Sequence, residues 1–298
     1  MSEATLHISV EKTAILTDFP SGSAMEFYEE HIYLMGDDAR HILILDTNYQ
    51  PVFNITMFEG GEKRIPKKEK SDIEASAIII HHYQPHLLAI GSASKSQRER
   101  TYLFALPAIA SSCFEIFDTG HFTDRLKDMA VAEVNIEGAA TVGDHLLLSN
   151  RGNKTNPDNL LFVTTANFFE QQPTAPIHII KVVLPQHEYP IGISALNYVA
   201  ALDVLFFTAS VELTANAYDD GGIGDSYLGY ISRISTLVNS DTIHPIVLVN
   251  LTHADPVFIG QKVESICIEK IENDILTAHL VSDNDNGEST LFKVLIHL

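Results

Sequence analysis

The sequence has no tryptophan, only two cysteines, and about half as many basic as acidic residues. Its 19 Lys and Arg residues against 39 Asp and Glu residues leave a formal net charge of −20 over 298 residues. Nucleic acids and anionic membranes select surfaces rich in Lys and Arg, so we expect neither as a main partner. A metal cation or a positively charged ligand is compatible with this chain, although an acidic surface also serves solubility alone.

The two cysteines, Cys113 and Cys267, lie in apolar and strand-like surroundings. We expect small core residues in a reducing compartment, with a single disulfide between them as the alternative. Long apolar runs are missing as well: none approaches about 18 uncharged residues, so no membrane-spanning helix is expected. The first residues, MSEATLHISVEK, lack the basic and apolar regions of a secretory signal, which predicts a cytoplasmic location.

Helical patterns are rare too, and the best candidate is a short one over 122–130. Strand patterns dominate instead, as short runs of Ile, Val, Leu, Phe and Tyr separated by Gly, Asn, Asp and Pro. The one basic stretch, GGEKRIPKKEKSD at 60–72, is expected to be an exposed loop. No segment has the length and composition of a linker, so residues 1–298 are predicted to form a single domain.

Five segments of the chain repeat one pattern: an apolar run, a turn, a second apolar run and a polar end. They begin at Ser21, Ile73, Ile136, Ile191 and Val263. Self-similar strand pairs at a regular spacing, here roughly 50–70 residues, are typical of propellers and other repeat folds.

Each repeat divides into strands A to D. The expected strands are 23–28, 31–36, 41–46 and 51–58; 75–81, 86–91, 100–106 and 113–117; 137–142, 145–149, 160–165 and 177–184; 192–198, 204–209, 227–234 and 246–251; then 264–270, 275–281 and 290–298. The last repeat lacks a strand, and the run 6–16 is a strand without a repeat. Pairing the two would close the ring without an open edge. The sequence thus predicts an all-β, five-bladed β-propeller closed by its N-terminal strand. Six blades, with 60–72 or 119–134 forming an irregular one, and a two-sheet sandwich are the alternatives.

In a propeller, the start of each innermost strand A and the end of each strand B lie around one mouth of the central channel. The expected residues there are Ser21, Glu74, Glu137, Ser194 and Glu264 from the A strands, and Asp37, Asp38, Lys95, Asn150, Arg151, Ser210, Glu212, Asp283 and Asp285 from the B strands. The predicted ligand-binding residues among them are Glu74, Lys95, Glu137, Arg151, Glu212 and Glu264, with Glu137 and Arg151 as catalytic candidates.

Clustered carboxylates raise one another's pKa unless a cation neutralises them, and calcium is the natural occupant of such a set. The predicted calcium ligands are Asp37, Asp38, Asp283 and Asp285. Basic residues such as Arg151 would instead hold a phosphate or carboxylate, and a metal beside them would suit ester hydrolysis. The competing interpretation of the glutamates is structural: each accepts backbone N–H bonds and fixes one blade to the next.

Other motifs are weaker. The segment DNDNGES at 283–289 is compatible with a calcium loop, but Asn-Gly favours a hairpin turn between two strands. The acidic, glycine-rich loop YDDGGIGDS at 218–226 could cover the mouth or bind a cation. His81, His82 and His86 are expected at an A–B turn on the opposite face, as solvent-facing or strand-edge residues. No G-x-S-x-G element is present for a serine hydrolase.

Three segments, IEGAA…HLLLSNRG, TASVE…DDGGIGDSYLG and VES…LVSDNDNGESTLFKV, resemble bacterial phytase-like propellers. This group is named for esterase-like activity of phytase, and domains of unknown function adjoin it. The resemblance implies a propeller, calcium, and hydrolysis of phosphoric or carboxylic esters. It places functional positions at Glu137, Arg151, Glu264, Asp283 and Asp285. The chain departs from a six-bladed phytase in its shorter length and in lacking dense Asp clusters.

Two functions remain open from the sequence. The first is a non-catalytic propeller that binds a small molecule, a protein or a cation at the acidic mouth. The alternative is a calcium-assisted phosphoric- or carboxylic-ester hydrolase. A divalent ion, if present, is expected to be calcium, and no other cofactor is expected.

Overall fold

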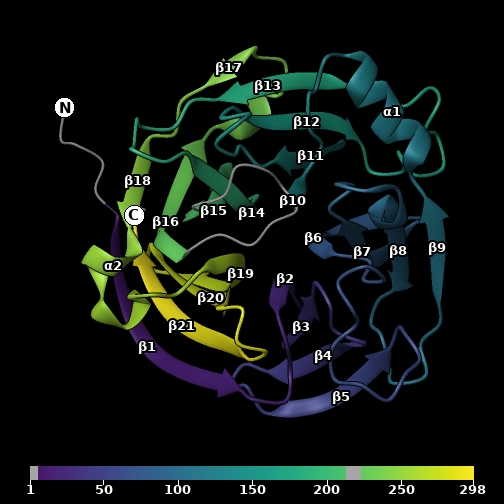
Figure 1. Cartoon of the computed structure of the whole chain (residues 1–298). Helices are drawn as coiled ribbons and strands as arrows, with labels where there is room; N and C mark the ends of the chain where they lie inside the picture. Colours follow the sequence, from purple (N-terminus) through teal and green to yellow (C-terminus); the bar gives the residue numbers. More distant parts are fainter. Residues whose placement is uncertain (1–5, 213–222) are drawn as a thin grey trace.

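The computed structural model describes residues 6–212 and 223–298, which form five antiparallel sheets arranged in a ring (Figure 1). Blade 1 holds β2 (Gly22–Tyr28), β3 (His31–Gly36), β4 (His41–Asp46) and β5 (Pro51–Thr56); blade 2 holds β6 (Ile73–His81), β7 (Gln84–Gly91), β8 (Arg100–Ala105) and β9 (Phe114–Asp118). Blade 3 holds β10 (Ile136–Val142), β11 (His145–Asn150), β12 (Asn159–Thr165) and β13 (His178–Val182); blade 4 holds β14 (Ile191–Val199), β15 (Val204–Glu212), β16 (Ile223–Ser232) and β18 (Val247–Asn250). Blade 5 holds β19 (Val263–Glu272), β20 (Ile275–Asp283), β21 (Ser289–His297) and β1 (His7–Leu16).

The ring closes through its two ends, as the sequence predicts. Strand β1 pairs antiparallel with β21, from Leu16 opposite Ser289 to His7 opposite His297. The first strand of the chain is thus the outer strand of the last blade, and the five-bladed propeller is confirmed. Residues 60–72 add no blade, and 119–134 contain the helix α1 (Gly120–Asp128), close to its predicted position.

The hydrophobic core lies between the blades rather than inside any one of them. Five clusters of buried apolar side chains each join two neighbouring blades around the ring. Strands that are covered on both faces need near-continuous apolar runs, and the repeats supply these runs. Gly138 permits one close approach, because a Cβ atom there would lie 2.7 Å from the backbone nitrogen of Leu196 in the next blade.

Three features differ from the sequence prediction. A short strand, β17 (Thr242–Ile243), leaves blade 4 and pairs in parallel with β13, so that the sheet of blade 3 gains a fifth strand. Cys267 is buried as expected, but Cys113 is exposed and both thiols are free, so the single disulfide is wrong. The basic stretch 60–72 is only partly an exposed loop, because Lys70 and the residues after it are buried.

Short helices occupy some connections: η1 (Ser96–Arg98), η2 (Ile234–Thr236), α2 (Leu251–Ala254) and η3 (Pro256–Phe258). Within 6–212 and 223–298, no helix has the length and apolar character needed to cross a membrane.

Candidate ligand-binding site at the channel mouth

Every innermost strand carries a β-bulge near its start, at its second residue in blades 1, 2, 3 and 5 and at its fourth residue in blade 4. The bulged residues are Ser23, Glu74, Glu137, Ser194 and Glu264. A bulge inserts one residue that the neighbouring strand does not pair, and it re-aims the side chain of that residue. In four blades the bulged residue is the one that the sequence analysis placed at the start of strand A. In blade 1 the equivalent residue is Ser23, not Ser21 as predicted.

The two bulged serines fix one blade to the next. The Ser23 hydroxyl donates to the carbonyl oxygen of Ile73, which begins the innermost strand of blade 2. The Ser194 hydroxyl donates to the carbonyl oxygen of Val263 at the same place in blade 5, at 2.8 Å. The bulged serines therefore link the blades, a role that the sequence analysis considered for the glutamates. The three glutamates have different surroundings.

Glu137 and Glu264 form ion pairs around one arginine. Nη1 of Arg151 lies 3.1 Å from Oε2 of Glu137 and 3.6 Å from Oε2 of Glu264. Its Nη2 donates to the hydroxyl of Ser210 at 2.7 Å, and Lys262 Nζ lies 2.8 Å from Oε1 of Glu264. Arg151 thus links blades 3, 4 and 5. A ligand can bind these buried carboxylates only if it breaks these ion pairs.

A lysine and an arginine from two loops neutralise the aspartates of blades 1 and 2. The ammonium group of Lys70 contacts Asp37 and lies 2.8 Å from Oδ1 of Asp72. Oδ2 of Asp72 lies 2.6 Å from Nη1 of Arg98 and accepts a 2.5 Å hydrogen bond from Ser92. Burial alone would lower the pKa of Lys70, but the charges of Asp37 and Asp72 outweigh it and raise that pKa.

Glu74 is the exception among these carboxyl groups. Ligand oxygens of Glu74, Asp37 and Asp72 all lie within 4.8 Å of one another. Within the described residues, no hydrogen bond or ion pair of the half-buried Glu74 is found. Burial raises the pKa of Glu74 well above its usual value, and the charges of Asp72 and Glu137 act in the same direction. Glu74 therefore keeps its proton to a higher pH than an exposed glutamate does.

Further buried oxygens at this mouth lack a donor. Oδ1 of Asp37 and Oδ1 of Asp38 accept no hydrogen bond from the part of the chain that the structure describes. Their other oxygens are held, that of Asp38 by Arg64 Nε at 2.6 Å. Burial raises the pKa of Asp37 to about 6 against the opposing charge of Lys70. Each of these two buried oxygens can accept a further hydrogen bond.

The B-strand residues of blade 5 form a turn. Asp283 is buried, and burial together with the charge of Asp37 raises its pKa to about 7. The backbone N–H of Asp285 donates to Oδ1 of Asp283 at 2.9 Å, within the five-residue connection from β20 to β21. The favoured hairpin interpretation of DNDNGES is thus confirmed, while calcium binding there stays a prediction.

Other predicted site residues are more peripheral. Lys95 and Asp285 are exposed, and Asn150 is buried with its side chain bonded to the backbone of Asn135 and Glu133. Most of the acidic loop 218–226 and the side chain of Glu212 lie outside what the structure describes.

Sequence reasoning missed Lys70, Asp72 and Arg98. Asp72 stands two residues before the bulged Glu74 and could have been found by aligning the repeats.

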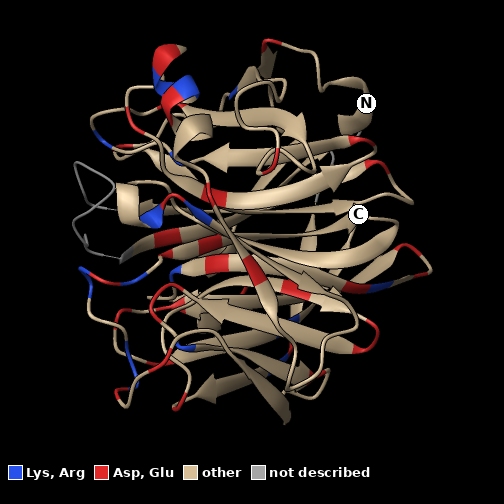
Figure 2. Ribbon diagram, turned by 90° about the vertical axis from the view of Figure 1, so that its right-hand side faces the viewer, with Lys and Arg blue, Asp and Glu red and all other residues tan. Residues whose placement is uncertain are grey.

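Lys and Arg residues are sparse, and in Figure 2 most of those visible lie toward the left, the side that faces the viewer in Figure 1. Four of the Lys and Arg residues, Arg64, Lys70, Arg98 and Arg151, pair with carboxylates at the channel mouth.

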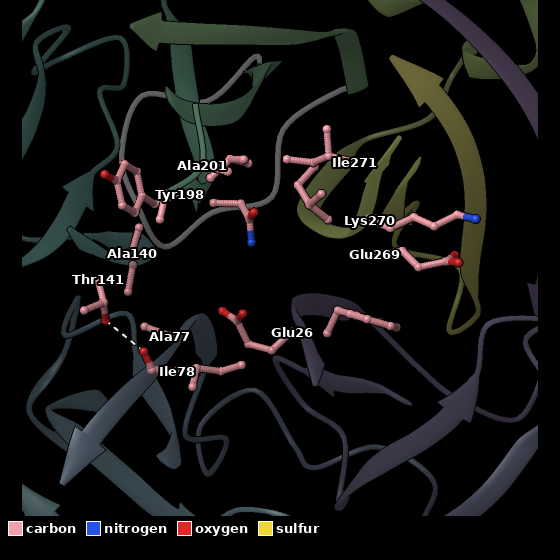
Figure 3. Close-up of a pocket in the computed structure, with 16 residues that line it drawn as sticks. Glu26, Ala77, Ile78, Ala140, Thr141, Tyr198, Ala201, Glu269, Lys270 and Ile271 are labelled. Carbon is pink, nitrogen blue, oxygen red and sulfur yellow. Dashed lines mark hydrogen bonds between the residues drawn. The ribbon is translucent and has the colours of Figure 1, made fainter. Parts of the chain in front are cut away.

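A cavity lies toward the other end of the innermost strands (Figure 3). It has a volume of about 410 Å³ and is lined by all five innermost strands, through residues such as Glu26, Ala77, Thr141, Tyr198 and Glu269. The Glu26 side chain points into it and accepts a 3.2 Å hydrogen bond from Ser76. Burial raises the pKa of Glu26 to about 8. Sequence reasoning missed this carboxyl group.

Residues 18–296 match the Family of unknown function (DUF6929), and the chain belongs to that family. No curated protein matches it in sequence. A crystal structure of Myxococcus xanthus glutaminyl cyclase is similar over 98% of this chain and 97% of that one, with a TM-score of 0.57 and 11% identity. A GH43 β-1,3-galactosidase is similar over 92% of this chain and 56% of its own length, with a TM-score of 0.50 and 10% identity. Identities this low show a common fold alone.

Proposed function

We propose that this member of the family binds a small organic molecule with a positively charged amino group at the channel mouth, and that Glu74 receives that group. One observation carries the proposal: Glu74 is a half-buried carboxyl group without a partner in the described chain, set among Asp37, Asp72 and Glu137. A cation that reaches a carboxyl group with a raised pKa lowers that pKa and favours the charged form.

An ammonium group suits this position better than calcium does. Calcium takes six to eight oxygen ligands, mostly carboxylates and carbonyls. Here Lys70 already contacts one oxygen of Asp37 and one of Asp72, while Arg98 and Ser92 hold the remaining oxygen of Asp72. A metal ion would have to displace these cations. A primary amine needs fewer acceptors, and Glu74 and the unbonded Oδ1 of Asp37 offer them.

Calorimetric titration of the full chain at pH 7 tests the proposal. The probes are 1,4-diaminobutane, glucosamine and a short peptide with an N-terminal glutamine, titrated in two buffers that differ in ionisation enthalpy. The peptide carries an α-ammonium group, and the similar protein from Myxococcus xanthus is described as a glutaminyl cyclase. We expect at least one probe to bind with release of up to about one proton from Glu74, because the ammonium lowers its pKa.

The Glu74→Gln variant should lose this binding and its proton release. Glu272→Gln is the matched control, since Glu272 pairs with Lys270 at the far end of an innermost strand. Equal binding by both variants, or no binding of any probe to the unaltered protein, would contradict the proposal.

Calcium-assisted hydrolysis of phosphoric or carboxylic esters, of the phytase-like kind, is the second candidate. The three carboxylates within 4.8 Å of one another favour it, and so do Arg151 and Lys262 as potential anchors for an anionic substrate. The contacts of Lys70 and Arg98 with the two carboxylate oxygens of Asp72 argue against calcium binding there. Calcium uptake, with hydrolysis of p-nitrophenyl phosphate or acetate that Glu137→Gln and Arg151→Ala abolish, would replace the first proposal with this one.

A further inference from the structure

A second group of side chains that can bind metal lies far from the channel mouth, at the other end of the innermost strands. His81 ends β6, and His82 follows it in the two-residue turn to β7. Glu170 lies in the connection between β12 and β13 of the neighbouring blade. One ligand atom from each of these three residues lies within 4.8 Å of the other two. The group therefore bridges blades 2 and 3.

The ring of His81 is held in place. His81 is buried, and its ring centroid lies 4.0 Å from that of His82 and 5.4 Å from that of His86. The buried ring of Phe169 packs beside it, with centroids 5.8 Å apart. Nε2 of His81 lies 3.9 Å from Oε1 of Glu170. The imidazole is thus oriented toward a carboxylate from another blade.

The turn itself does not call for histidine. His82 and Tyr83 have φ values of 47° and 64°, a geometry that favours Asn, Asp or Gly. The hairpins of blades 1 and 5 make the same turn with Glu29–Glu30 and Asn273–Asp274. Backbone geometry thus leaves the choice of an imidazole at residue 82 unexplained.

We propose that His81, His82 and Glu170 bind a transition-metal ion, with Zn²⁺ as the best match, and that the ion ties blade 2 to blade 3. Two imidazoles and one carboxylate, with water in the fourth position, form a known zinc arrangement. Tetrahedral zinc spaces its ligand atoms roughly 3.3 Å apart, given bonds of about 2.0–2.1 Å to nitrogen and oxygen. Since His82 and Glu170 are exposed, small side-chain rotations can close the present 3.9 Å separation.

Zinc titration of the metal-free full chain tests this site by calorimetry. His82→Ala and Glu170→Gln are exposed substitutions that remove one ligand each. His31→Ala is the control, because His31 follows the corresponding hairpin turn of blade 1 and is not one of the three proposed ligands. We expect one equivalent of Zn²⁺ to bind, and affinity to fall at least about tenfold in the two ligand variants but not in the control.

Cobalt gives an independent readout. Bound Co²⁺ should show the intense visible absorption of a tetrahedral site in the unaltered protein and in His31→Ala, and lose it in Glu170→Gln. The proposal is overturned if Zn²⁺ does not bind, or if His82→Ala and Glu170→Gln bind both metals as the control does.

Discussion

Replacing Glu26 with Gln should stabilise the protein at neutral pH and have little effect in acid. In the folded protein the pKa of Glu26 is raised from 4.5 to about 8 by burial. The folded state therefore keeps a proton that the unfolded chain loses above its own pKa. Unfolding releases this proton, so the contribution of Glu26 to the free energy of unfolding falls as pH rises from 4.5 toward 8.

The size of the effect follows from the pH interval. Between an unfolded pKa of 4.5 and pH 7, each pH unit is worth about 1.4 kcal/mol, so the loss reaches about 3 kcal/mol at most. Gln keeps the shape of the protonated acid and an oxygen that can accept from Ser76. The Glu26→Gln variant has no carboxyl group at this position, so its free energy of unfolding does not fall in this way. Its advantage over the unaltered protein should grow with pH and level off above about 8.

Urea denaturation at pH 4.5, 7 and 8.5 measures this difference, and titration of other groups cancels between the two proteins. Glu269→Gln is the contrasting control, since Glu269 lines the same cavity. Burial alone would raise the pKa of Glu269, but Lys293 and His279 outweigh it and lower that pKa. That variant should therefore lose stability at neutral pH. A stability difference for Glu26→Gln that does not change with pH would refute the reasoning.

Two further substitutions test the contacts between blades. Arg151→Ala leaves Glu137 and Glu264 without their shared partner. Chemical denaturation should therefore show that the free energy of unfolding falls by about 3–5 kcal/mol. A fall of less than about 1 kcal/mol would mean that the ion pairs are not desolvated. Ser194→Ala removes a buried hydrogen bond to the carbonyl oxygen of Val263 and should cost about 1–3 kcal/mol, whereas an unchanged urea midpoint would show that water replaces the hydroxyl.

The repeat pattern was sufficient to predict the ring and its closure. Strands covered on both faces are apolar throughout, so their positions are visible in the sequence, and counting them left 6–16 as the missing partner of the last blade. The same repeats also placed Glu74, Glu137 and Glu264 at equivalent positions. In blade 1, the sequence did not reveal which serine occupies the bulge, because a bulge changes the register without a fixed residue signature.

The pairing of charges at the mouth could not be predicted. Lys70 lies in an irregular connection and Arg98 in the three-residue helix η1, and segments this short show no hydrophobic period. Lys70 and Arg98 balance the charge of Asp72 through ion pairs, whereas no such pair of Glu74 is found in the described part of the chain. Internal salt bridges thus hold Asp37, Asp38 and Asp72, and calcium binding at this mouth stays a prediction.

The proton release that accompanies amine binding tests the central role of Glu74 most directly. Calorimetry of the unaltered protein at pH 7 in two buffers should show a probe amine binding with release of up to about one proton, and Glu74→Gln should remove both. Binding without proton release, or binding that survives in Glu74→Gln, would contradict the assignment of this residue as the receiving group.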